Sequence, residues 1–87
     1  MKTIWKWELT PEGFIEMPKG SKVLCVQEQQ GLPQLWALVD PSAEMETRQF
    51  STYGTGHLVE KDSGVYIGTF QLDSMVFHVF EEGVDVN

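Results

Sequence analysis

Short stretches in which apolar and polar residues alternate set the strongest limit on how this chain can fold. Their apolar residues recur at every second position, and no window shows the i, i+3, i+4, i+7 spacing of an amphipathic helix. We expect strands at Lys2–Leu9, Phe14–Met17, Lys22–Gln29, Leu35–Asp40, Thr47–Tyr53, Val65–Leu72 and Met75–Glu81. Turn residues lie between them. The sequence therefore predicts an all-β fold, a single small antiparallel sandwich or barrel of about six to seven short strands.

Some segments carry more detailed expectations. Lys22–Gln29 begins apolar on both faces, which indicates a central strand covered on each side. Pro41–Glu46 is expected to be the longest irregular segment, and Leu58–Glu60 a short extended one. A turn is expected at Lys61–Gly64, and the acidic tail Glu82–Asn87 is expected to fray.

The length of the chain predicts one domain, spanning residues 1–87, whose stability as a monomer is marginal. A domain of 87 residues buries a small core. Its one cysteine allows no internal disulfide, so assembly is the usual remaining source of stability. With three tryptophans available for an interface, we expect a homo-oligomer, either a dimer or a tetramer.

The charge of the chain restricts its partners. Thirteen acidic and six basic side chains give a net charge of −7, which disfavours duplex DNA or RNA but permits a small phosphate in a locally basic pocket. No apolar run is long enough for a transmembrane helix, and the N-terminus lacks the apolar core of a signal peptide. We therefore expect no membrane partner and a reduced, intracellular setting, with Cys25 as an ordinary buried thiol.

The stretch Gly54-Thr55-Gly56-His57 is the leading candidate for a binding site. It reads either as a simple turn between strands, with His57 facing solvent, or as a turn whose backbone N–H groups attract an anion. Arg48 lies in the strand that leads to this turn. Its guanidinium either contributes to an anion site or forms an ion pair with Glu46 or Glu60.

Two further side chains belong to the candidate set. His78 lies in an apolar strand, as either a core histidine with one hydrogen bond or a polar group at the mouth of a pocket. Trp36, like Trp5 and Trp7, either stacks on a base or belongs to the core or an interface. The candidate ligand-binding residues are Trp36, Arg48, Thr55, Gly56, His57 and His78.

The common catalytic patterns are missing from the sequence. There is no Gly-x-Ser-x-Gly run and no P-loop, and Val59 stands where a dinucleotide fingerprint needs its third glycine. Cys25 is flanked by apolar residues, where a thiol is usually inert. The histidines and carboxylates show no metal-ligand spacing. We expect no enzymatic activity, no metal and no cofactor.

Five segments carry a resemblance to a known family: Leu35–Pro41, Glu46–Arg48, Gly54–His57, Tyr66–Phe70 and Phe77–Phe80. They cover most of the chain beyond Leu35 and follow an aromatic-rich first strand. In these segments the chain resembles a widespread family of short bacteriophage proteins of mostly unknown function.

The resemblance implies a role in immune evasion. Some phage proteins are oligomeric sponges that sequester the cyclic nucleotides made by antiphage systems such as CBASS, and this chain is similar to one such group. It implies an anti-CBASS protein of the host cytoplasm that binds a cyclic nucleotide without cleaving it. Two other functions stay open: a protein-binding inhibitor that uses its acidic surface, and a self-assembling accessory phage structural protein.

The expected oligomer is directly testable. Gel filtration coupled to light scattering should give a mass well above the 9.9 kDa of one chain, because the small core and the surplus of large aromatics favour assembly. A clean monomer at micromolar concentration would contradict this expectation.

Overall fold

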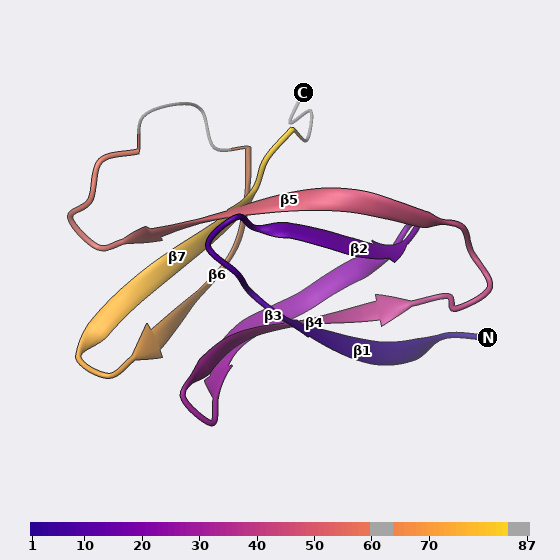
Figure 1. Cartoon of the computed structure of the whole chain (residues 1–87), viewed down its shortest axis with the longest axis horizontal. Coiled ribbons are helices and arrows are strands. Elements are labelled where there is room, and N and C mark those ends of the chain that lie inside the picture. Colours follow the sequence, from indigo (N-terminus) through magenta and orange to yellow (C-terminus); the bar gives the residue numbers. More distant parts are fainter. Residues whose placement is uncertain (60–63, 84–87) are drawn as a thin grey trace.

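The computed structural model describes residues 1–59 and 64–83, which form two antiparallel sheets (Figure 1). The strands are β1 (Thr3–Glu8), β2 (Phe14–Pro18), β3 (Lys22–Gln29), β4 (Leu32–Val39), β5 (Met45–Gly54), β6 (Val65–Leu72) and β7 (Met75–Glu81). One sheet has three strands in the order β1-β4-β3, and the other has four in the order β2-β5-β7-β6. The described residues contain no helix, so the predicted all-β antiparallel fold is confirmed.

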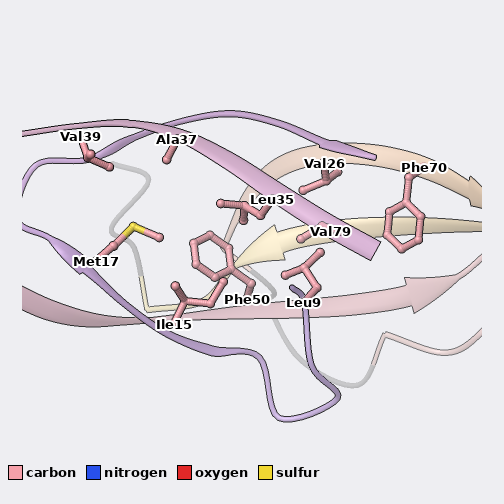
Figure 2. Close-up of a cluster of buried hydrophobic side chains, with 10 residues drawn as sticks. All are labelled: Leu9, Ile15, Met17, Val26, Leu35, Ala37, Val39, Phe50, Phe70 and Val79. Atoms are coloured by element: carbon pink, nitrogen blue, oxygen red, sulfur yellow. The ribbon is translucent and has the colours of Figure 1, made fainter. Parts of the chain in front are cut away.

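The hydrophobic core lies between the inner faces of the two sheets. Alternation along β4 directs Leu35, Ala37 and Val39 inward, and all three are fully buried. The four-stranded sheet faces them with Ile15 and Met17 from β2, together with side chains from β5, β6 and β7 (Figure 2). Removal of this apolar surface from water is the main force that holds the sheets together.

The two sheets also meet along β3 and β6, which lie side by side but belong to different sheets. Gly68 allows this approach, because a Cβ atom at that position would lie 3.0 Å from Cγ2 of Val26. The pairing register shifts between Val23 and Cys25 on β3, and between Tyr66 and Gly68 on β6. Within the described residues no backbone ladder joins β3 to β6, so the sheets do not close into a barrel.

The prediction of a central strand at Lys22–Gln29 is wrong. This segment is β3, which lies at the edge of the three-stranded sheet, and Leu24 on it is 46% exposed. The register shift explains the error. Leu24 is the extra residue of a β-bulge, and a bulge breaks the alternation and places apolar residues on both faces.

Several boundaries also differ from the sequence expectation. β4 begins at Leu32 rather than Leu35, because Gln30 and Gly31 alone make the turn, with φ of 55° and 81°. β5 begins at Met45, which shortens the irregular segment expected at Pro41–Glu46. Leu58 and Val59 belong to no strand. The remainder of Leu58–Glu60, most of the turn at Lys61–Gly64 and the end of the tail lie outside the described residues.

An ion pair closes one end of the space between the sheets. Arg48 on β5 donates to Glu81 on β7 through Nε to Oε2 at 2.6 Å and through Nη2 to Oε1 at 2.7 Å. Its Nη1 donates to the carbonyl oxygen of Ser21 at 2.6 Å, at the residue that leads into β3. The two charged side chains are only 18% and 10% exposed, and the Glu81 carboxylate raises the pKa of Arg48. One guanidinium thereby connects the four-stranded sheet to the start of β3.

Removing one partner of this ion pair should destabilise the domain. Arg48→Met leaves the Glu81 carboxylate shielded and unpaired, so the free energy of unfolding should fall by about 3 kcal/mol in urea titrations. Lys19→Met is the matched control, because the Lys19–Glu44 pair is 3.9 Å long and exposed. Its loss should cost less than about 1 kcal/mol. Equal losses in the two variants would show that the Arg48–Glu81 pair has no special role.

Candidate functional site

Gly54, Thr55, Gly56 and His57 form a tight turn at the end of β5. The His57 amide donates to the carbonyl oxygen of Gly54 at 3.0 Å, which closes the turn. Gly56 has a φ of 87°, the left-handed conformation that glycine adopts without strain. The Thr55 amide donates to the carbonyl oxygen of Val76 at 3.0 Å, so the turn is fixed to the start of β7.

A pocket of about 260 Å³ lies beside this turn, on the outer face of the four-stranded sheet. We call it the turn pocket. It is lined by the turn itself, by His78, and by aromatic rings from three strands: Tyr53 of β5, Tyr66 of β6 and Phe80 of β7. The lining has a mixed chemistry of aromatic rings, imidazoles, a hydroxyl and backbone. Among the described residues it includes no acidic side chain, in contrast to the strongly acidic protein as a whole.

A chain of hydrogen bonds crosses the face of the sheet at the turn pocket. Nε2 of His78 lies 2.7 Å from the Thr55 hydroxyl, and its Nδ1 lies 3.0 Å from the Thr69 hydroxyl. The Thr69 hydroxyl in turn lies 2.5 Å from the phenol oxygen of Tyr66. A hydroxyl both donates and accepts, so this arrangement accommodates either neutral tautomer of His78. The imidazole is therefore held in one orientation at the pocket.

The aromatic side chains of the pocket support one another. The ring of Phe80 makes edge contacts with Tyr53, at a centroid separation of 6.1 Å, and with Tyr66, at 5.6 Å. Such edge-to-face pairs are favourable beyond the area they bury. Phe80 thus fixes two tyrosines on either side of it, and Tyr66 remains 55% exposed to a ligand.

His57 reaches the pocket from the turn and is exposed. Its ring lies over Gly54, where an added Cβ atom would be 2.7 Å from Cε1 and 2.8 Å from Nδ1 of the imidazole. Gly54 therefore serves a different purpose from Gly56. It leaves room for the imidazole, whereas Gly56 supplies the turn conformation.

The structure brings together four of the six candidate residues predicted from sequence: Thr55, Gly56, His57 and His78. His78 lies on the outer face at the pocket, not in the core. Arg48 is six residues before Gly54 on β5, about 20 Å along the strand, on the inner face of the sheet. Its partner is Glu81 rather than Glu46, and Glu60 lies outside the described residues.

Trp36 is also absent from the turn pocket. It lies on β4, on the outer face of the other sheet, and lines a separate groove. Sequence reasoning missed the three pocket aromatics Tyr53, Tyr66 and Phe80. Phe80 alternates with His78 and was detectable on that basis. The two tyrosines depended on pairings that local sequence does not encode, since Tyr53 pairs with His78 and Tyr66 with Phe80.

Two larger hollows have simpler chemistry. One of about 510 Å³ lies between β3 and β6 and is lined by residues 24–28 and 67–71. Another of about 330 Å³ lies at the end of the core and is mostly apolar. The second hollow has the stacked rings of Phe70 and Phe77 in its wall, but neither hollow is lined by a histidine. The turn pocket adds two imidazoles to its aromatic rings, which makes it the stronger candidate for specific recognition.

The part of the chain that the structure describes has neither a metal-binding cluster nor a membrane-spanning helix. It contains no group of three or more His, Cys, Asp or Glu side chains placed to hold a metal ion. It also contains no helix of the length and apolar character needed to cross a membrane.

Comparison with known protein families matches residues 1–86 to a domain of unknown function, DUF7352. The chain belongs to the DUF7352 family. No curated protein and no solved structure matches it. The matched range includes both sheets and the turn pocket.

The contact between His57 and Gly54 predicts a local effect of mutation. Gly54→Ala should displace the His57 ring, because a Cβ atom cannot lie 2.7 Å from it, and should leave both sheets intact. The NMR signals of the His57 imidazole should shift while the backbone spectrum of β2 and β3 stays unchanged. Thr47→Ala is the control, since Thr47 is an exposed residue on the same strand, far from the turn. An unshifted His57 signal in Gly54→Ala would show that the ring does not pack there.

Proposed function

We propose that this DUF7352 protein binds a cyclic nucleotide in the turn pocket and sequesters it unchanged, as a phage sponge for a host immune signal. The observation that carries the proposal is the meeting of aromatic rings, two imidazoles and a glycine turn in one pocket whose described lining includes no acidic side chain. These groups match the two halves of a nucleotide, a flat base and an anionic phosphate.

The aromatic rings supply a surface for the base. Tyr66 is exposed and is supported from behind by Phe80, and Tyr53 lies against the other side of Phe80. Stacking of a base on such a ring contributes about 1–3 kcal/mol and tolerates different bases. Tyrosine also retains a hydroxyl that can recognise a polar edge of the base.

The turn and the histidines supply donors for the phosphate. His57 is exposed at the rim, the Thr55 hydroxyl lies between the turn and His78, and Gly56 keeps the backbone of the turn free of side chain. Hydrogen bonds from such groups to an ionised phosphate are stronger than those between neutral partners. Because no described acidic side chain lines the pocket, phosphate affinity at this site is compatible with the net charge of −7.

The size of the pocket limits how much ligand it holds. At about 260 Å³ it is slightly below the usual range of about 300–1,000 Å³ for ligand pockets. It therefore suits one base with its sugar and phosphate, and the rest of a cyclic dinucleotide or trinucleotide would lie at the pocket mouth.

The first experiment asks whether any nucleotide binds. Purified protein is denatured, and the released small molecules are identified by mass spectrometry, in parallel with calorimetry on a panel of cyclic di- and trinucleotides. An intact cyclic nucleotide in the released fraction, or its binding in the calorimeter, supports the proposal. If none of the nucleotides binds the folded protein, the proposal is wrong.

Variants then locate the site. Thr55→Val and His57→Ala each remove a donor for phosphate and should weaken binding by about 1–3 kcal/mol. Thr47→Val is the matched control, since Thr47 is an exposed threonine on the same strand, far from the pocket. If the folded Thr55 and His57 variants bind as tightly as the control, the nucleotide binds somewhere else on the protein.

A further inference from the structure

The basic side chains of this acidic protein are unevenly placed. In residues 1–59 and 64–83 there are five lysines and arginines. Arg48 is paired inside with Glu81, and Lys19 with Glu44. Of the other three, Lys6 and Lys22 project from the outer face of the three-stranded sheet, and Lys2 lies just before β1.

Lys6, Lys22 and the apolar residues between them form what we call the basic patch, and the strand register shows how they are arranged. Ile4, Leu38 and Lys22 lie in one row across the sheet, and Lys6, Trp36 and Cys25 lie in the next. Lysines therefore flank an apolar centre on both edge strands. Ile4 is 55% exposed and Leu24 is 46% exposed, and both line the same groove, so they form an exposed apolar patch.

A groove of about 280 Å³ runs through the basic patch. It is lined by Ile4, Leu24, Cys25, Gln27 and Trp36. Cys25 was expected to be an ordinary buried thiol, but it is half-buried in the wall of this groove. The groove is therefore mostly apolar, with positive charge on both sides.

An acidic patch with the opposite character lies on the other sheet. Phe14 and Glu16 project outward from the edge strand β2, and Phe14 is 59% exposed. Met45, at the start of β5, pairs with Pro18 of β2 and is 55% exposed. Glu12 is exposed in the turn before β2. This patch thus carries a protruding aromatic ring and a methionine beside two carboxylates.

We propose that the basic patch of one chain binds the acidic patch of a second copy, with Phe14 of that copy in the groove beside Trp36. The lysines would then face Glu12 and Glu16, and the apolar centres of both patches would be removed from water. The two patches lie on the outer faces of different sheets, so they cannot meet within one chain. The contact is heterologous and produces a closed ring or an open chain of copies.

The alternatives fit the charges less well. A two-fold contact through the basic patch would bring the positive charges of two identical patches together. Single-stranded nucleic acid could stack on Trp36, but three lysines on a protein of net charge −7 provide little attraction for a phosphate backbone. An acidic, apolar surface is the better complement, and the chain itself carries one.

The test uses two variants, each with one patch removed. The basic-patch variant is Ile4→Ser, Lys6→Gln and Lys22→Gln, and the acidic-patch variant is Phe14→Ser and Glu16→Gln. All five residues are exposed, so both variants should fold, as circular dichroism will verify. Lys19→Glu is the control for net charge, because it and the basic-patch variant both change the charge from −7 to −9.

Sedimentation velocity measures the assemblies. The wild type and Lys19→Glu should form particles of several copies in about 0.05 M salt and dissociate at about 0.5 M. Each patch variant alone should stay near 9.9 kDa. An equimolar mixture of the two should form a dimer and nothing larger, because each chain keeps only one intact patch, acidic in one variant and basic in the other.

Three results would overturn the proposal. They are a wild type that stays monomeric at low salt, a patch variant that still assembles like the control, and a mixture of the two variants that remains monomeric. Titration with a fluorescent oligothymidylate tests whether single-stranded nucleic acid binds in the groove instead. Tight binding of this oligonucleotide to a monomeric wild type, lost in the basic-patch variant, would assign the patch to nucleic acid instead.

Discussion

One charged contact at the end of the apolar core fixes how the two sheets lie against each other. Arg48 satisfies both oxygens of Glu81 and the carbonyl of Ser21 with a single guanidinium, and so joins elements of both sheets. A planar fork of donors is needed for this, and lysine could not replace it. Among the described residues the core comprises only ten buried apolar side chains, so a fixed polar contact at its end helps to define how the sheets lie against each other.

The inner faces of the two sheets are used for packing, whereas the outer faces are available for binding. The inner faces hold the core and the Arg48–Glu81 pair, which leaves the outer faces free for recognition. On the four-stranded sheet, the turn pocket lies toward β6 and β7, and the acidic patch lies toward β2. A ligand in the pocket and a second copy on the acidic patch would therefore not compete for the same residues.

The strands were readable from sequence because alternation is a local property. The segments Val65–Leu72 and Met75–Glu81 match β6 and β7 residue for residue. The site was only partly readable, because its residues meet through pairings between distant strands. Nothing in the sequence near Arg48 indicates that its partner is Glu81, 33 residues later. The bulge at Leu24 made the edge strand β3 look like a central strand, because it places apolar residues on both faces. Thr55 and His57 were found because the turn that carries them is itself a local signal.

The strand order has a consequence for how the protein is made. The hairpins β3–β4 and β6–β7 join neighbours in sequence, whereas β1 must pair with β4, and β2 with β5. Ribosomes deliver the N-terminal strands first, but each must wait for a partner synthesised later. Distant pairings of this kind also slow folding. The strand with Trp5 and Trp7 and the strand with Phe14 therefore leave the ribosome before their partners and stay unpaired until β4 and β5 follow.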